Sequence, residues 1–244
     1  LVIESTGISE PLPVATTFSF RDEDDQSLDD VARLDTMVTV VDALNLLADY
    51  DSRDFLADRG ETAGEGDGRT LVDLLVEQIE FADVVVINKI GEATPEQREK
   101  VRQVVRGLNG DARIVEADFG RVPLAAVLDT RLYSEERSQE HPLWHKELFG
   151  FKDHVPETEE YGIRSFVYRA RRPFNPRKLY DLLEQRLPGV IRAKGHFWLA
   201  TRPRWVGEYS LAGRITRTEG MGSWWAAVPK ERWPRSEEFV SLMR

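Results

Sequence analysis

The segment from Leu71 to Lys89 constrains the fold of this chain more than any other part of the sequence. Its first half predicts a helix, with Asp73, Glu77 and Glu80 in solvent and with a buried stripe of Leu71, Leu74, Leu75, Gln78 and Ile79. Four consecutive β-branched residues, Val84 to Ile87, then predict a strand covered on both faces, as parallel strands are.

Asn88 and Lys89 follow the carboxyl end of that predicted strand. In open α/β sheets, ligands bind in the crevice outside these strand ends. We therefore take both residues as candidate ligand contacts. Spacing alone leaves an alternative open, in which Asn88 begins a turn and Lys89 is a solvated lysine.

Strands and helices alternate through the first half of the chain, which predicts a parallel, doubly wound sheet. The expected elements are a strand at 37–41 that ends at Asp42, a helix capped by Thr94 that runs to about Leu108, a strand at 112–117 and a helix at 124–128. Asn109 and Gly110 predict a left-handed stop after the long helix.

Leu1, Val2 and Ile3 predict the end of a buried strand, followed by the loop Glu4 to Gly7. A carboxylate and a glycine amide at such a strand end can face the water shell of a magnesium ion and a terminal phosphate. The alternative is a plain turn whose glycine adopts a tight backbone conformation. The acidic run from Asp22 to Asp30 predicts a solvated, mobile loop without chemistry.

The stretch from 133 to 160 has no sustained period and predicts a linker. His141 and His145 lie one turn apart if this stretch is helical, with Glu140 and Glu147 nearby. Two histidines at that spacing can share a zinc ion, but two ligands make a weak site. We expect only weak zinc binding there.

The last third, from 161 to 244, predicts a smaller domain with a mainly antiparallel sheet and one or two helices. Its expected elements are a helix striped by Leu179, Leu182 and Leu183, and strands at 163–170, 190–201, 205–211, 214–218 and 224–228. Between 162 and 217 there are 13 lysines and arginines against 3 acidic residues, although the whole chain has a net charge of −10. This basic excess suits an anion, an acidic partner, docking of one domain on the other or simple solvation.

Bulk composition excludes several classes of protein. The acidic balance argues against general nucleic-acid binding, and no apolar run approaches the roughly 18 residues of a membrane span. The chain contains no cysteine, which excludes disulfides and thiolate metal ligands within these 244 residues. We expect a cytoplasmic protein that binds neither nucleic acid nor membrane.

Four ordered blocks resemble the CobW-like metal-chaperone GTPases. They are IESTG at 3–7, VVDA at 40–43, QIEFADVVVINK at 78–89 and KGHFWLATR at 194–202. The resemblance covers nearly the whole chain and implies a switch segment with Glu4 and Gly7 near the γ-phosphate. It also implies that Asn88 and Lys89 bind the nucleotide base.

The sequence departs from the family pattern in several places. No GxxxxGK[ST] phosphate loop and no Cys-x-Cys-Cys motif is present, Asn175 stands where histidine is usual, and Gly91 replaces the aspartate that grips guanine. Glu92 lies one position late for that role. A missing base-edge acceptor costs on the order of a few kcal/mol of discrimination, so the guanine selectivity of Asn88 and Lys89 alone is in question.

The resemblance implies an α/β chain in three parts: part of a doubly wound P-loop-type GTPase domain at 1–132, a linker at 133–160 and an α+β CobW carboxyl-terminal domain at 161–244. The complete protein is expected to use GTP and magnesium to deliver zinc, or else cobalt, to a client metalloenzyme held by the carboxyl-terminal domain. This chain alone is expected to be inactive. The alternative function is a non-catalytic module that binds a client or serves as a scaffold.

Overall fold

The computed structural model describes residues 1–60, 68–134, 163, 166–185 and 187–233. The chain forms two compact units, of which the first holds residues 1–167 and 212–215 and the second holds 168–211 and 216–244. His141, His145 and nearly all of the predicted linker lie outside the described residues. The predicted boundaries of the three parts therefore stay predictions.

The first unit is built on a three-stranded parallel sheet, as the alternation of strands and helices predicts. Its strands are β1 (Val38–Asp42), β2 (Val84–Asn88) and β3 (Arg113–Glu116), in the order β1-β2-β3. The register pairs Asp42 with Asn88 and Ile87 with Glu116. Because all three strands run the same way, their carboxyl ends lie at one edge of the sheet.

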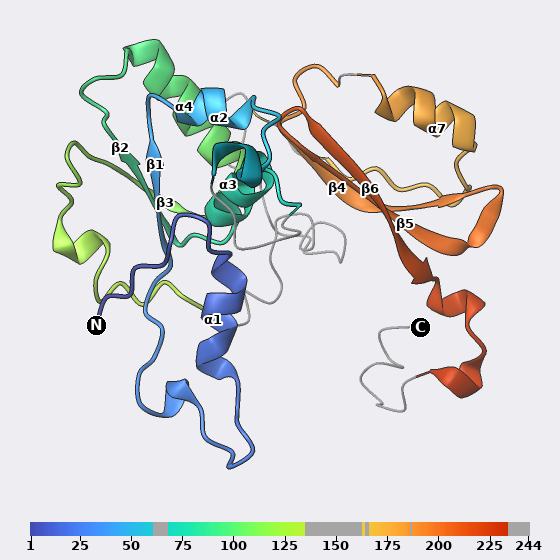
Figure 1. Ribbon diagram of the computed structural model, residues 1–244, viewed down its shortest axis with the longest axis horizontal. Helices are drawn as coiled ribbons and strands as arrows, with labels where there is room; N and C mark the ends of the chain where they lie inside the picture. The colour runs from blue at the N-terminus through green and yellow to red at the C-terminus, as the bar shows by residue number, and fades with distance from the viewer. Residues whose placement is uncertain (61–67, 135–162, 164–165, 186, 234–244) are drawn as a thin grey trace. The chain divides into compact units, whose positions relative to one another are not determined.

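Strand β2 is covered on both faces. Helices α2 (Leu46–Tyr50), α3 (Leu71–Glu80) and α4 (Pro95–Leu108) lie together on one face of the sheet (Figure 1). On the other face, Val84, Val86 and Ala117 form a buried cluster against Val115 and against Val122, Val127 and Leu132 of the segment after β3. This double burial confirms the interpretation of the β-branched run at 84–87.

Helix α3 is buried more widely than one stripe would allow. Leu74 and Ile79 are buried as predicted, but Val72 and Val76 are also almost fully buried, while Leu71, Leu75 and Gln78 are only half buried. Glu80, expected in solvent, is 4% exposed. The reason is that α3 packs against the sheet and against α2 and α4, so more than one side of the helix is covered.

Helix α4 begins as predicted and ends differently. Thr94 and Gln97 form a reciprocal capping box ahead of Pro95. At the other end, Asn109 has an extended backbone with φ −145° rather than the predicted left-handed one. Its buried side chain explains this conformation, because Nδ2 donates to the carbonyls of Ile79, Glu80 and Ala82 at 2.8–3.0 Å, and Oδ1 accepts from the Ala112 amide.

The amino-terminal residues depart from the prediction. Residues 1–6 are in no strand, and the side chains of Leu1, Val2 and Ile3 are exposed. Three residues provide too few ladder hydrogen bonds to hold a strand at the edge of a sheet. They lead into helix α1 (Pro11–Ser19).

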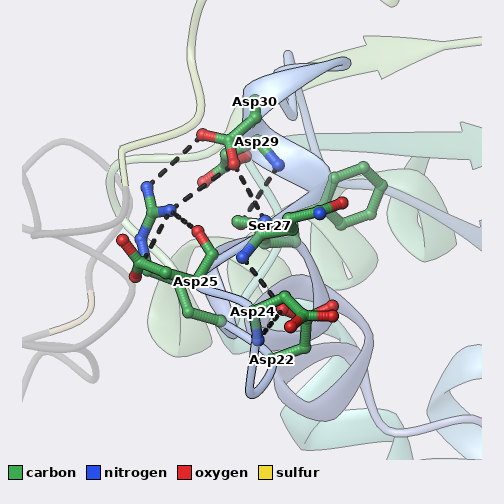
Figure 2. A network of polar contacts seen from close by, with 9 residues as sticks. Asp22, Asp24, Asp25, Ser27, Asp29 and Asp30 are labelled. Carbon is green, nitrogen blue, oxygen red and sulfur yellow. Dashed lines mark hydrogen bonds and ion pairs between the residues drawn. The ribbon is translucent and has the colours of Figure 1, made fainter.

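The acidic run after α1 is exposed, as its charge predicts, and it is also ordered by hydrogen bonds within a turn. Arg21 contacts the carboxylate of Asp30, the Asp22 carboxylate accepts the amides of Asp24 and Gln26, and Ser27 caps the short 3-10 helix η1 (Leu28–Asp30), as Figure 2 shows. The charged side chains of Arg21, Asp22, Asp25 and Asp30 make their contacts within the turn itself. They form no donor set directed at a ligand.

Short helices replace two predicted elements. The helix expected at 124–128 is the 3-10 turn η3 (Leu124–Ala126), and the strand expected at 224–228 is the 3-10 turn η5 (Trp225–Ala227). Further 3-10 turns are η2 (Leu56–Arg59) and η6 (Lys230–Arg232).

No helix in the described part of the chain has the length and apolar character needed to cross a membrane.

The second unit consists of helix α7 and an antiparallel sheet, as predicted. Asn175 caps α7 (Pro176–Leu183), and the strands are β4 (Arg192–Leu199), β5 (Arg202–Ala212) and β6 (Ile215–Ser223), in the order β4-β5-β6. The described residues of the strand expected at 163–170 are in no strand. Among the described residues before α7, Phe174 pairs with Leu199 of β4 in an isolated bridge.

Asn109 supports a first prediction about stability. Replacing Asn109 with alanine removes four hydrogen bonds at a buried junction of α3, β2, α4 and β3. We expect the free energy of unfolding to fall by about 2 to 4 kcal/mol, measured by urea denaturation. Gln103→Ala, which removes a solvent-facing amide of the same helix, is the control and should change it by less than about 0.5 kcal/mol. Equal losses in the two variants would contradict the role of Asn109.

Candidate functional site

The carboxyl edge of the first sheet gathers the polar side chains that follow its three strands. We define the carboxyl-edge site as Asp42 at the end of β1, Asn88 at the end of β2, Lys89 directly after it, and Asp118 in the loop after β3. Lys89 Nζ lies 2.8 Å from Asp42 Oδ2. Asp42 also accepts the Leu44 amide and the Asn45 side chain, each at 2.8 Å, so it holds the turn before α2 rather than capping that helix.

These contacts shift the pKa values of Asp42 and Lys89 so that both side chains are charged. Partial burial acts to raise the pKa of Asp42, but hydrogen bonds from Lys89 and from the Leu44 amide outweigh it and hold that pKa below its ordinary value. The hydrogen bond to Asp42 raises the pKa of Lys89 above its ordinary value. Lys89 is therefore a fixed cation at this edge at neutral pH.

Asn88 is held by the loop that follows β3. The Gly120 amide donates to Asn88 Oδ1 at 3.1 Å, and the Ile90 amide donates to the carbonyl of Ala117 at 3.2 Å. These bonds fix which way the Asn88 amide group faces, with its oxygen toward the loop. In the described part of the chain, the NH2 group of Asn88 has no hydrogen-bond partner of its own.

Asp118 is the member of the site that sequence reasoning missed. Its Oδ1 accepts the Gly91 amide at 2.7 Å, and its side chain is half buried. A polar residue directly after the predicted strand at 112–117 was the available signal. This signal alone did not indicate a contact with Gly91, because Asp118 lies 27 positions further along the chain.

The two loops of the site carry unusual backbone conformations. Lys89 has φ +60° and Phe119 has φ +54°, although neither is glycine. Such conformations are uncommon for side chains of this size and concentrate at ligand sites. Phe119 is also 83% exposed, so the rim of the site presents an aromatic ring to solvent.

The structure does not join Glu4 and Gly7 to the rest of the candidate site. In the described residues, neither has a hydrogen bond or ion pair with Asn88 or Lys89. The Gly7 carbonyl instead accepts Nε2 of Gln78 from α3 at 2.8 Å. Gly7 does lie in a turn, in which the Ser9 amide donates to the Thr6 carbonyl at 2.9 Å, but its φ is not positive, so the turn does not need the special glycine conformation considered from the sequence.

Helix α3 therefore holds the Glu4–Gly7 loop from the side. Gln78 also reaches the Ser9 carbonyl at 3.2 Å, and Arg69 donates to the Ile8 carbonyl at 3.1 Å. Gln78, expected only to pack, is the residue that ties this loop to the helix leading into β2. The roles assigned to Glu4 and Gly7 stay predictions.

No metal centre is formed by the residues that the structure describes. Among them, no group of three or more histidine, cysteine, aspartate or glutamate side chains is arranged to hold a metal ion. His141 and His145 lie outside this part of the chain. The described residues thus offer no ligand set for zinc by themselves.

Comparison with known proteins gives the family. Residues 1–116 match the family described as "CobW/HypB/UreG, nucleotide-binding domain", and residues 163–244 match the "Cobalamin synthesis protein cobW C-terminal domain". The chain belongs to the CobW family. The two family matches fall in the two parts that the sequence predicts as the nucleotide-binding part and the carboxyl-terminal domain.

Relatives of this CobW chain include proteins named for zinc. It is 42% identical over 238 residues to zinc-regulated GTPase metalloprotein activator 1 of Dictyostelium discoideum, covering 96% of this chain and 50% of that protein. It is 32% identical over 196 residues to a zinc chaperone of Mycobacterium tuberculosis, covering 80% and 44%. The chain thus spans about half the length of these curated relatives.

A solved structure also matches at low similarity. The Zn(II)-bound YjiA GTPase from E. coli is 17% identical, with a TM-score of 0.38, over 91% of this chain and 61% of that one.

The ion pair of Lys89 and Asp42 predicts a pH dependence of stability. Because the pKa of Asp42 is lowered in the folded state, its contribution is present above the ordinary value of about 4 and is lost as the pH falls through the folded pKa. The wild type should therefore exceed Asp42→Asn in unfolding free energy near pH 7, and the gap should close toward about pH 3.

Urea denaturation across this pH range measures the gap. Added salt should narrow it near pH 7, because Lys89 is half exposed and screening weakens the pair. A gap that widens as the pH falls would show that the Asp42 carboxylate does not stabilise the fold.

Proposed function

We propose that this chain carries the base-binding edge and the client-binding domain of a GTP-dependent metallochaperone that handles zinc. The observation that carries the proposal is the carboxyl-edge site, where Asn88 and Lys89 follow a doubly covered parallel strand and are held by Gly120 and Asp42. Open α/β sheets bind their ligands at such an edge. The names of the relatives supply the expectation of zinc and GTP.

The chemistry of Asn88 suits a purine. Its oxygen is occupied by the Gly120 amide, so the side chain presents NH2 donors to a ligand. The N7 atom of adenine or guanine accepts such a donor. Asn88 thus supports binding of a purine base but does not discriminate between the two purines.

Lys89 adds a cation and an apolar stem at the same edge. Its ammonium is fixed by Asp42, which leaves the methylene stem along the rim of the site. Lysine stems cover apolar surface while their charge stays in water, and the face of a base is such a surface. Loss of this side chain should therefore weaken binding of the base.

Binding of the nucleotide phosphates and of the zinc cargo needs groups other than the described residues. The 244 residues contain no GxxxxGK[ST] motif, so the backbone cradle that normally positions phosphates is not part of this sequence. Zinc is the cargo of the proposed activity, and no step through it is assigned to the described residues. The basic excess at 162–217 supports an acidic client surface as the partner of the carboxyl-terminal domain.

Lys89→Ala tests the base-binding edge. We expect the variant to bind GTP about ten times more weakly than the wild type. The reason is that it lacks the methylene stem that packs on the base and the ammonium beside it. Binding is measured by nuclear magnetic resonance titration, which follows the amide signals of Gly91 and Gly120. Lys100→Ala is the matched control, since Lys100 makes a similar 2.9 Å ion pair with Glu96 on the solvent side of α4. Equal affinities of Lys89→Ala and wild type would place the nucleotide elsewhere.

Hydrolysis is expected to be absent from this chain by itself. Positioning by loop amides and by the loop lysine supplies most of phosphoryl-transfer catalysis, and neither is present in these 244 residues. A phosphate-release assay on the isolated chain should match the uncatalysed background. Turnover that survives stringent purification and is lost when Gly7 is changed would contradict this expectation and show that these 244 residues hold a working phosphate site that includes Gly7. A requirement for a second polypeptide would favour the scaffold alternative.

A further inference from the structure

The Asp118 carboxylate occupies the space that a side chain at position 91 would fill. A Cβ atom built on Gly91 would lie 2.8 Å from Asp118 Oδ2, 3.1 Å from Oδ1 and 3.2 Å from Cγ. The Gly91 amide donates to Oδ1 at 2.7 Å, so the carboxylate is held there by a hydrogen bond. Glycine at position 91 and the carboxylate of Asp118 therefore belong together, since any larger residue would displace that carboxylate.

The position of Asp118 is fixed relative to Asn88. The Ala117 amide, just before Asp118, donates to the Ile87 carbonyl at 2.9 Å, and the Gly120 amide, just after it, donates to Asn88 Oδ1. The segment after β3 is thus bonded to the end of β2 on both sides of Asp118. The Asp118 carboxylate therefore has a defined place at the same edge of the sheet as Asn88.

The acceptor capacity of this carboxylate exceeds its use. A carboxylate has about four lone-pair sites, and the Gly91 amide takes one of them. The half-buried side chain leaves acceptor sites open at the rim of the carboxyl-edge site. Guanine presents two adjacent donors, N1–H and the 2-amino group, whereas adenine presents neither N1–H nor a 2-amino group.

We propose that Asp118 reads the guanine edge, accepting N1–H and the 2-amino group from the loop after β3. The carboxylate that the sequence lacks at position 91 is thereby supplied from 27 residues further along the chain. This inference rests on the proposed binding of a purine nucleotide at Asn88 and Lys89. Asp118 is a specificity-determining residue for that nucleotide, and Glu92, an exposed side chain, is not needed for the role.

A purely structural role for Asp118 makes a different prediction. Acceptance of the Gly91 amide needs one oxygen and no charge, so asparagine would serve equally well. Base reading needs two acceptors facing two donors, so asparagine would fail with guanine. Asparagine instead matches xanthine, because xanthine has N1–H and a C2 carbonyl that accepts the asparagine NH2 group.

The experiment uses this chain and its Asp118→Asn variant, titrated with GTP, ITP, XTP and ATP in magnesium buffer. Amide signals of Gly91 and Gly120 give the affinities. The wild type should prefer GTP to XTP and to ATP by roughly ten- to a hundredfold, and GTP to ITP by a smaller factor, since ITP lacks only the 2-amino group. Asp118→Asn should reverse the order of GTP and XTP.

A carboxylate exchange provides the second variant. Gly91→Asp alone should not improve the preference for GTP, because the new side chain collides with the Asp118 carboxylate. Asp118→Ala should lose the preference, and Gly91→Asp combined with Asp118→Ala should regain a large part of it. Asp129→Asn, which removes a carboxylate that is 84% exposed in a nearby loop, is the control for net charge and should behave as wild type.

The outcomes separate the two proposals. A guanine preference that persists unchanged in both Asp118→Asn and Asp118→Ala overturns the role of Asp118 but leaves nucleotide binding at Asn88 and Lys89 intact. Wild-type amide shifts that are absent with all four nucleotides overturn the proposed function, and the role of Asp118 with it. Reversal to XTP in Asp118→Asn, with binding of the wild type to GTP, supports both.

Discussion

The parallel pairing of β2 between β1 and β3 is the constraint on which the rest of the first unit depends. It brings three loops that are far apart in sequence to one edge of a sheet, with Asp42 directly paired with Asn88 in the register. Burial of β2 on both faces stabilises this pairing, because apolar surface is removed from water on each side of the strand. Every contact of the carboxyl-edge site follows from that arrangement.

Hydrogen bonds across the edge turn this proximity into a defined geometry. The Lys89 ammonium is joined to Asp42, the Asn88 oxygen to the Gly120 amide, and the Gly91 amide to Asp118. Each bond joins segments that belong to two different strands or the loops after them, so these segments hold one another in place. Preorganised polar groups of this kind bind a ligand without first losing conformational freedom, which favours affinity and selectivity.

Two side chains on the helical side of the sheet connect α3 to other segments of the first unit, Asn109 at the amino ends of β2 and β3 and Gln78 at the loop before α1. Asn109 joins the end of α3 to the start of β3 through four hydrogen bonds, and Gln78 joins α3 to the carbonyls of Gly7 and Ser9. Helix α3 thus contacts the Glu4–Gly7 loop at its side and leads directly into β2 at its end.

The sequence by itself determined the local elements and the identity of the sheet's buried strand. The β-branched run at 84–87, the capping pair of Thr94 and Gln97 and the family blocks depend only on neighbouring residues, and each was read correctly. Tertiary structure alone decided the burial of Glu80, the extended backbone of Asn109 and the meeting of Gly91 with Asp118. The physical reason is that these depend on which segments pack together, and a carboxylate 27 residues away completes a site only after parallel pairing has aligned the ends of β2 and β3.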